Sequence, residues 1–496
     1  MTMAPVEYED IQGLVRFGYR GMTQAVFLLL RVTDARAARA WLAQAPVASA
    51  VTREPPPATA LQIAFTSVGL QALGLPQDLV DGFSPEFLSG MGGDASRARR
   101  LGDLGPNDPA CWQWGGTPET VPHVMAMLYA EPGRLEDWGA EAMAGAEQGF
   151  EQLAMLTTSD MDGVEPFGFA DGISEPSIDW QRERAAKDVE REDYTNLSCL
   201  GEYLLGYPNE YGAYTDRPLL DAARDPGAVL ARAEDAPGHA DLGRNGSYLV
   251  LRQLEQDVAG FWRFVDAQVH GDPARRKQLA EAMVGRTMDG QPLMGRASEP
   301  IEGEDDPRNT FTYRDDPAGL RCPHGAHIRR SNPRNADLPP GPGGFVSWAQ
   351  RTLGFDADAL AEDLVASTRF HRLLRRGREY GPGVSLPDAL AGRTPQAPTG
   401  LHFICLGANI ARQFEFVQSA WLAGLRFNGS PGESDPLIGT HLPRADGTAT
   451  DSFSIPSADG PAHRVCGLPQ FVTVRGGAYF FLPGLRALGF IAKGTP

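Results

Sequence analysis

Hydrophobic and polar positions along the chain follow a pattern that occurs twice. Residues 25–45, AVFLLLRVTDARAARAWLAQA, read as a buried strand followed by an amphipathic helix, for which Thr33 or Asp34 can supply the N-cap. Residues 246–266, GSYLVLRQLEQDVAGFWRFVD, have the same arrangement. A second pair of segments, residues 60–73 and 400–417, also runs strand, small turn and helix. This internal repeat predicts two structurally similar halves.

Each half contains further strand candidates, at HVMAMLYAEP and QLAMLTTSD in the first half and at FVTVRGG and AYFFLPG in the second. Four strands and about two main helices per half favour an α+β fold of two ferredoxin-like units, each an antiparallel sheet with helices, around a shared ligand cavity. We expect an N-terminal half over residues 1–180, a polar insertion or linker over 181–245 and a C-terminal half over 246–496. The alternative is that the repeat reflects only the strand-then-helix order that many α+β proteins share.

Composition and charge narrow the possible partners. The 496 residues include 63 acidic and 45 basic ones, a net charge of −18, which disfavours binding to nucleic acid or anionic membranes. No apolar run approaches the ~20 residues that a membrane helix needs. The five cysteines are scattered and odd in number, and the N-terminal segment has no signal-peptide core and no twin arginine. We therefore expect a cytoplasmic protein without a disulfide framework.

Two of the nine histidines, His324 and His327, lie in the segment RCPHGAHIRRSNPR, residues 321–334. Cys322 and the two histidines are possible zinc ligands, although structural zinc normally takes four. The four arginines of the segment would suit a phosphate or carboxylate. In a third interpretation, one histidine is the axial ligand of a haem iron and the arginines pair with the propionates, which uses both residue types. No Cys-x-x-Cys-His occurs, so a covalent c-type haem is not expected.

Two other segments carry candidate chemistry. In EPFGFADGISEPS, residues 165–177, small residues surround Asp171 and apolar neighbours indicate a partly buried turn. A buried carboxylate needs a reason to be there, but Asp and Gly are also the ordinary residues of a turn. The segment HRLLRRGREYGPG, residues 371–383, is either a basic helix end that stops at Gly377 or a segment that turns an arginine toward an anionic site.

Together these three segments resemble the dye-decolorizing peroxidase family of haem proteins. GFADG resembles the family's Gly-x-x-Asp-Gly signature, which implies that Asp171 lies above the haem. CPHGAHIRRSNPR is similar to the segment that carries the proximal histidine, which falls on His327. LRRGREYG is similar to the segment with the distal arginine, which falls on Arg375, five residues before a Tyr-Gly pair. EDIQGLV, GSYLVLRQLEQ, DPLIG and other stretches extend the resemblance in order over nearly the whole chain, whose length is similar to that of the larger bacterial members.

The resemblance implies further site residues and shows two departures. The family's remaining site positions fall on Asp435 (acidic partner of the proximal imidazole), Leu401 and Phe403 (distal pocket), and Arg329 and Arg334 (propionate contacts). Position 379 is Glu379, where many relatives have proline. The segment between His327 and Arg375 is longer than in the smaller members, which puts the placement of the loop that carries Arg375 in doubt.

The implied fold is two ferredoxin-like halves around a haem cavity, an arrangement like a dimeric α+β barrel. The implied protein is a peroxidase with non-covalent haem b (iron protoporphyrin IX) that reduces hydrogen peroxide through a ferryl intermediate and oxidises dyes, phenolics or other one-electron donors. Asp171 and Arg375 would be its catalytic residues, and since the reference pKa of an aspartate is about 3.9 we expect an acidic pH optimum.

The resemblance leaves other properties open. The chain would be a monomer or homo-oligomer that binds peroxide and small donors, with no nucleic-acid or membrane partner. Bulky donors would pass electrons through an aromatic residue, with Trp262, Trp421 and Tyr380 as candidates. The alternative functions are a haem-handling or iron-releasing protein, a chlorite-degrading enzyme of related fold and, in a different class, a non-enzymatic metal-binding module.

Overall fold

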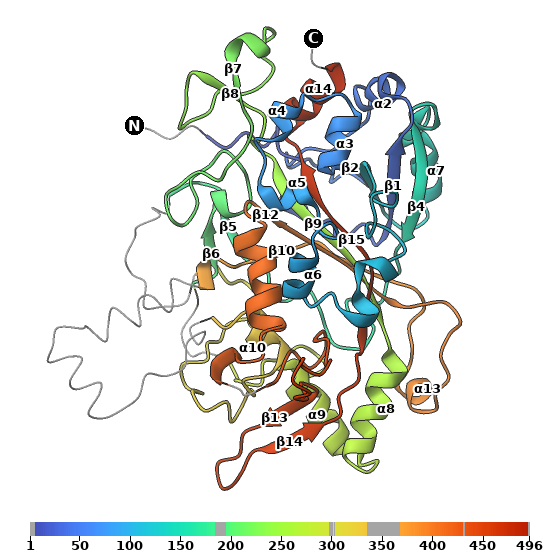
Figure 1. Cartoon of the computed structure of the whole chain (residues 1–496), viewed down its shortest axis with the longest axis vertical. Coiled ribbons are helices and arrows are strands. Elements are labelled where there is room, and N and C mark those ends of the chain that lie inside the picture. Colours follow the sequence, from blue (N-terminus) through green and yellow to red (C-terminus); the bar gives the residue numbers. More distant parts are fainter. Residues whose placement is uncertain are drawn as a thin grey trace, which may run out of the picture.

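One antiparallel sheet of nine strands runs through the molecule (Figure 1). In this computed structural model, residues 5–183, 195–296, 301, 303–334, 368–429 and 432–494 are described. The strand order is β10-β12-β9-β15-β2-β3-β1-β4, with β11 also paired to β12. The strands of the sheet are β1 (Gln24–Val32), β2 (Thr59–Phe65), β3 (Val124–Ala130), β4 (Phe150–Thr157), β9 (Ser247–Gln256), β10 (Leu374–Arg375), β11 (Arg378–Tyr380), β12 (Gly400–Gly407) and β15 (Val472–Leu482).

Each half of the sheet has the strand order of a ferredoxin-like unit. The first half runs β4-β1-β3-β2, and the second runs β15-β9-β12 with the short β10 and β11 in the place of its second strand. The halves meet edge to edge where Phe481 of β15 pairs with Phe65 of β2. The expected α+β fold of two ferredoxin-like halves is therefore confirmed. The expected resemblance to a barrel is not confirmed, because the path of described strands ends at β4 and β10 and the sheet stays open.

The first repeat in the sequence corresponds to equivalent elements. Helix α2 (Ala35–Leu42) follows β1 and is capped by Asp34, whose carboxylate accepts the backbone N–H groups of residues 36 and 37 at 2.8 and 2.9 Å. Helix α8 (Val258–Gln268) follows β9 and is capped by Asp257. The other helices are α1 (Leu14–Phe17), α3 (Ser67–Ala72), α4 (Gln77–Val80), α5 (Pro85–Ser89), α6 (Ala95–Leu101), α7 (Leu135–Ala142), α9 (Pro273–Val284), α10 (His327–Ser331), α13 (Leu386–Leu390) and α14 (Leu485–Lys493).

The second repeat pair was matched to the wrong strands. β2 is the second strand of its half, whereas β12 is the third strand of its half and is therefore the counterpart of β3. After β12 comes a wide helix of two π-helical stretches, Ala411–Glu415 and Val417–Leu422, in the position that α7 occupies in the first half. Both segments have the same strand-then-helix periodicity, and periodicity does not distinguish one strand of a unit from another.

A segment expected as two strands is a single one. Residues 471–484 contain one continuous strand, β15, with a bulge between Val474 and Gly476 in its pairing with β9. The bulge at Arg475 adjoins the Gly476–Gly477 pair, and the indole of Trp114 occupies the place that a Cβ on Gly476 would need. A pair of glycines often marks a turn in a sequence, but here it makes room for a close contact within a strand.

The described part of the expected linker contributes residues to the hydrophobic cores of the sheet. Alternate residues of β2 and β3 enter two different cores, so both faces of these strands are buried. Tyr203, Leu204 and Tyr207, all at most 1% exposed, belong to the core that also contains Phe27. The expectation of a surface segment is therefore wrong for residues 195–210 and 241–245, which are mostly buried, whereas residues 211–240 include many exposed positions. Residues 184–194 lie outside the described ones. The short strands β5 (Ser177–Asp179) and β6 (Leu197–Cys199), β7 (Leu219–Asp221) and β8 (His239–Asp241), and β13 (Ser452–Ile455) and β14 (His463–Cys466) form separate pairs.

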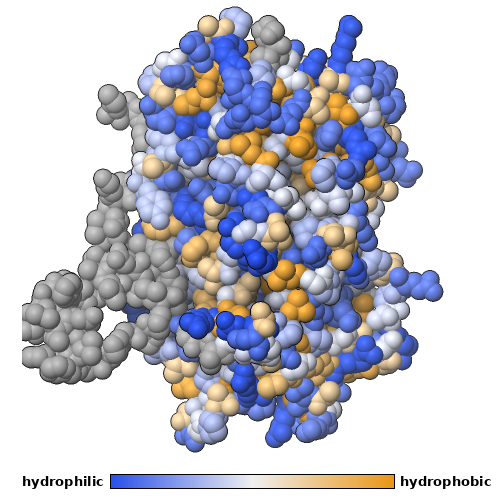
Figure 2. Space-filling view, in the orientation of Figure 1, coloured by the Kyte–Doolittle hydropathy of each residue, from blue (hydrophilic) through white to orange (hydrophobic). Residues whose placement is uncertain are grey.

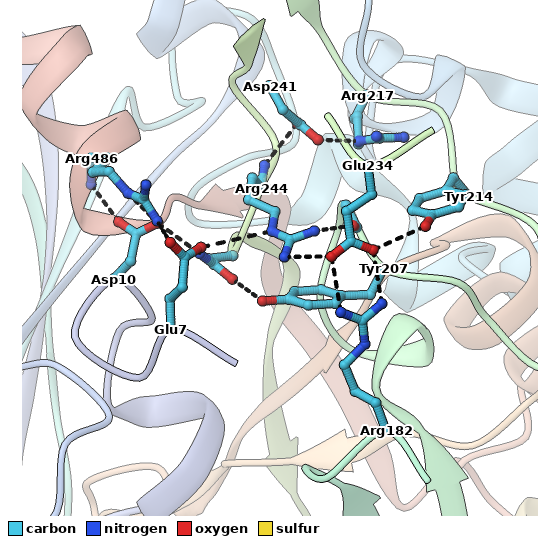
Figure 3. A network of polar contacts seen from close by, with 12 residues as sticks. Glu7, Asp10, Arg182, Tyr207, Tyr214, Arg217, Glu234, Asp241, Arg244 and Arg486 are labelled. Carbon is cyan, nitrogen blue, oxygen red and sulfur yellow. Dashed lines mark hydrogen bonds and ion pairs between the residues drawn. The ribbon is translucent and has the colours of Figure 1, made fainter. Parts of the chain in front are cut away.

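A network of charged side chains joins this segment to both ends of the chain (Figure 3). Glu234 accepts hydrogen bonds from Arg182 at 2.8 and 2.9 Å and from Arg244 at 2.9 Å. Arg244 also faces Glu7 near the N-terminus, at 3.9 Å, and Glu7 pairs with Arg486 of α14. The network explains why segments more than 200 residues apart in sequence meet at the same end of the molecule.

The visible surface is mixed in character. Figure 2 shows hydrophilic side chains over most of this face, with hydrophobic ones scattered between them. The five cysteines are unpaired thiols. Among the described residues, no helix combines the length and the apolar character that crossing a bilayer requires.

The contact between Trp114 and the bulge gives a first prediction. We expect Gly476→Ala to lower the free energy of unfolding by about 1–3 kcal/mol, because the added methyl group would overlap the indole. Urea unfolding measures the change. Gly460→Ala is the control, since a methyl group there meets no atom within 4 Å. Equal stability of the two variants would contradict the proposed contact.

Candidate functional site

A cavity of about 300 Å³ lies on one face of the C-terminal half of the sheet. Successive residues of a strand point to opposite faces, so every second residue of neighbouring strands can line one cavity. The residues that do so are Arg252, Leu254 and Gln256 of β9, Leu401 and Phe403 of β12, and Val472 and Val474 of β15. The remaining walls come from α10, the wide helix 411–422, the end of α9 and the loop at 165–176.

Strand register places Arg375 on the same face. Arg375 of β10 pairs with Cys405, two residues beyond Phe403 on β12, so its side chain shares the face of Leu401 and Phe403. Its Nη1 donates to Oδ1 of Asp171 at 3.0 Å. The structure therefore brings together the two residues that the sequence predicts as a catalytic pair, and the longer segment before Arg375 does not displace it.

Asp171 is held by a turn in which glycine is required. Gly168 and Gly172 have φ values of 95° and 69°, a region that other residues rarely adopt. The N–H of Gly172 donates to Oδ1 of Asp171 at 2.6 Å. Burial alone would raise the pKa of Asp171, but the charge of Arg375 and the hydrogen bond from Gly172 outweigh it, so that the pKa lies below its ordinary value of 3.8. Asp171 is therefore a carboxylate, able to accept a proton, even in acidic solution.

His327, the first residue of α10, reaches the cavity from another side. Its Nδ1 lies 2.9 Å from Oδ2 of the fully buried Asp435. Burial opposes the charge of Asp435, but the imidazole and the N–H groups of Leu437 and Ile438, the latter two bound to Oδ1 at 2.9 and 3.0 Å, stabilise it and lower its pKa. An ionised carboxylate only accepts hydrogen bonds, so Nδ1 carries the proton and Nε2 is the nitrogen that remains for a ligand.

A second, polar cavity of about 220 Å³ adjoins the first. The two cavities share Asp171, Arg375, Leu401 and Phe403, so the aspartate–arginine pair lies between them. The other residues of the second cavity are Gly18, Arg20, Thr23, Ser159, Asp160, Gly163, Gly172, Glu175, Arg376, Gly377, Arg378 and Glu379. Such a wall suits a small polar molecule on its way to the pair, and Glu379, opposite Leu401 in the sheet, is part of it.

The first cavity fits a haem. Apolar side chains such as Phe167 and Leu437 line it, and His327 presents Nε2 as a possible ligand. Arg286 and Arg334 also line it and both donate to Oδ1 of Asn309. Burial and the neighbouring charge of Arg334 lower the pKa of Arg286 to about 10, so an anionic group beside these two guanidiniums would be stabilised. Haem propionates are anions of this kind.

Two interpretations of the histidine segment are corrected. Arg329 does not line the cavity, because it is 1% exposed and donates to Asp316 at 2.9 Å and to the carbonyl of Cys322 at 2.7 Å. It supports the segment rather than a propionate. A zinc site with Cys322 is also wrong for the described residues, which contain no cluster of three potential ligands.

Sequence reasoning missed two residues of the site. Arg286 follows the end of α9, a position typical of a surface arginine, and no sequence pattern singles it out. Glu175 lies in the quoted turn, four residues after Asp171, and a second acid in so small a turn was an available signal. Of the proposed aromatic relays, Trp262, Trp421 and Tyr380 are all at most 7% exposed, and only Trp421 of the three lines the cavity.

Comparisons with known proteins agree with this site. No protein-family model matches the chain. The dye-decolorizing peroxidase msp1 of Mycetinis scorodonius is 28% identical over 516 residues, covering 98% of this chain and 88% of that protein. The multifunctional dye peroxidase of Amycolatopsis sp. is 30% identical over 402 residues, covering 77% of this chain and 74% of that protein.

Solved structures share the fold. A dye-decolorizing peroxidase variant in complex with cyanide has a TM-score of 0.71 at 24% identity, covering 99% of this chain and 100% of that chain. The dye-decolorizing peroxidase of Auricularia auricula-judae has a TM-score of 0.70 at 25% identity, covering 98% of this chain and 100% of that chain. From the sequence relatives, the shared fold and the cavity together, the chain belongs to the dye-decolorizing peroxidases, a family of haem-dependent enzymes that act on peroxide.

Proposed function

We propose that Asp171 and Arg375 are the catalytic residues of this peroxidase and that His327 is the axial ligand of a non-covalently bound haem b. The observation that carries the proposal is that His327, oriented by Asp435, and the Asp171–Arg375 pair line the same cavity from different elements. No cysteine occurs among the described residues of the cavity wall, which supports non-covalent binding.

Each cofactor-binding residue has a separate task. The haem, when bound, supplies the redox chemistry, which is two-electron reduction of peroxide followed by one-electron oxidation of donors. Nε2 of His327 would bind the iron while Nδ1 donates to Asp435, which makes the imidazole a stronger electron donor. Arg286 and Arg334 would pair with the propionates.

The catalytic residues manage protons and charge. Asp171 accepts a proton from one oxygen of hydrogen peroxide and returns it to the other, so that water leaves. Arg375 stabilises the negative charge that develops on the departing oxygen as the O–O bond breaks. Complete reduction of one peroxide to two waters takes up two electrons and two protons. The reaction therefore needs a supply of protons and an ionised Asp171. An acidic pH above the pKa of Asp171 meets both conditions, and we propose an acidic optimum for this reason.

The proposed donors are dyes, phenolics and similar small reductants. One related enzyme was solved in complex with 2,6-dimethoxyphenol. The net charge of −18 argues against nucleic acid or an anionic membrane as a partner. Five free thiols fit a reducing compartment, and we propose the cytoplasm.

The role of His327 predicts the effect of its removal. His327→Ala should bind little haem, because His327 is the one histidine of residues 321–334 that lines the cavity. Haem content after reconstitution, measured from the Soret band against protein concentration, tests this. His324→Ala is the matched control from the same segment, and it should keep the haem, since His324 does not line the cavity. Equal haem content in both variants would reject His327 as the ligand.

The catalytic pair predicts slow reaction with peroxide. Asp171→Asn should lower the rate constant for the first spectral change after mixing with hydrogen peroxide by about 10²–10⁴-fold, because the base is lost. Arg375→Leu should lower it by about 10²–10³-fold, because the developing charge is no longer stabilised. Stopped-flow absorbance of the haem-loaded variants measures both. If either variant reacts as fast as the parent, the substituted residue is not catalytic.

The pKa of Asp171 predicts the shape of the pH profile. A base works in its ionised form, and a pKa below the ordinary 3.8 keeps Asp171 ionised at every pH above that value. The rate constant for peroxide should therefore fall on the acid side with a midpoint below 3.8. Stopped-flow measurements from acidic to neutral pH test this. An acid-side midpoint well above 3.8, or a maximum above neutral pH, argues against Asp171 as the base.

A further inference from the structure

We infer that Glu175 is a positioning residue, which holds the guanidinium of Arg375 against Asp171 and so keeps it ready for the departing oxygen. The inference rests on the proposed roles of Asp171 and Arg375. It assigns a function to a third charged residue of the distal turn, one that does not itself exchange protons with peroxide.

Glu175 contacts Arg375 at two places. Its Oε2 accepts the backbone N–H of Arg375 at 2.8 Å. Its Oε1 lies 3.0 Å from Nη2 of the same residue. One carboxylate therefore binds both the main chain and the tip of the arginine side chain, which fixes the direction of the side chain relative to β10.

The guanidinium of Arg375 forms polar contacts through both of its terminal nitrogens. Nη1 donates to Oδ1 of Asp171 at 3.0 Å, and Nη2 donates to the carbonyl of Ser174 at 3.1 Å in addition to Glu175. All three partners belong to the loop 171–175. A single rigid turn thus carries the proposed base and sets the place of the proposed charge stabiliser, and without Glu175 only Asp171 and one carbonyl would remain to orient Arg375.

Glu175 is itself held in place. Its backbone carbonyl accepts a hydrogen bond from Nδ2 of Asn196 at 2.7 Å, and Oδ1 of Asn196 accepts one from Arg372 at 2.9 Å. Asn196 and Arg372 are both buried. The turn and the segment that leads into β10 are therefore connected twice, once through the side chain of Glu175 and once through Asn196, and of these two links the Glu175 side chain is the one that contacts Arg375.

The charge of Glu175 also has a local purpose. Arg375 and Arg376 follow each other in the sequence, and Nη1 of Arg376 lies 4.0 Å from Oε2 of Glu175. The two arginines and the carboxylates of Asp171 and Glu175 place two positive and two negative groups near the junction of the two cavities. Without Glu175, Asp171 would be the only carboxylate among the described residues in contact with Arg375, and the guanidinium would be freer to turn toward the polar cavity.

The test is a double-mutant cycle on the haem-loaded enzyme with hydrogen peroxide as substrate. Glu175→Ala should lower the rate constant for the first spectral change by about 10- to 100-fold, the ordinary cost of misplacing a catalytic group by about 1 Å. In the Arg375→Leu background the same change should have almost no further effect, because Glu175 acts through Arg375. A residue with a merely structural role would lower both rates alike.

A crystal structure of the haem-loaded Glu175→Ala enzyme gives a readout that does not depend on turnover. We expect the guanidinium of Arg375 to leave Asp171 or to occupy more than one position. Glu234→Ala is the matched control, since Glu234 also lies between two arginines and its side chain is 21% exposed, against 19% for Glu175, but it lines neither cavity (Figure 3). The control should react with peroxide within about twofold of the parent rate.

Either of two results overturns the inference: Glu175→Ala reacts like the parent with Arg375 in place, or its loss of rate adds in full to that of Arg375→Leu. If Glu175→Ala does not fold or bind haem, Glu175→Leu replaces it, because leucine fills similar space but accepts no hydrogen bond, and a parent-like rate in that variant is equally decisive. Failure of the proposed function looks different. In that case the parent does not react with peroxide, or Arg375→Leu is as fast as the parent, and the inference falls with it.

Discussion

The ion pair between Asp171 and Arg375 is the interaction on which the site depends. It joins residues 204 positions apart. One lies on a loop that follows the first half of the sheet, and the other lies on β10, the edge strand of the second half. Each charge is costly to bury alone, and removing one partner of a buried pair typically costs about 3–5 kcal/mol. The pair therefore links the two halves and, through the same contact, places a base beside a cation where the two cavities meet.

The two aspartates of the site differ only in their neighbours. Asp435 faces an imidazole and two backbone N–H groups and is fully buried, so it fixes the proton on Nδ1 of His327 and leaves Nε2 to a metal. Asp171 faces a guanidinium and open space, with 31% of its side chain exposed to the cavities. Both have lowered pKa values. In the proposed mechanism one carboxylate tunes a ligand and the other moves a proton, because of the two only Asp171 can be reached by a substrate.

Sequence patterns predicted the parts of this molecule that depend on local periodicity and on short motifs. The strand-and-helix units at 25–45 and 246–266, the turn around Asp171 and the neighbours of His327 are of this kind. The errors concern facts that periodicity does not contain. The strand-helix units at 60–73 and 400–417 look alike but occupy different places in their halves, because strand order is set by long-range pairing. Arg329 and Arg334 are both basic residues near His327, yet only the backbone path decides that one turns to Asp316 and the other to the cavity.

The polar composition of residues 195–245 was the most misleading signal. A segment with many charges can be buried when its charges pair with one another, as Glu234 does with Arg182 and Arg244 (Figure 3). These ion pairs hold one end of the segment in place. At the other end Asn196 bonds both Glu175 and Arg372, next to the distal turn. The segment thus contacts the chain termini at one end and the turn of Asp171 at the other, both through polar residues.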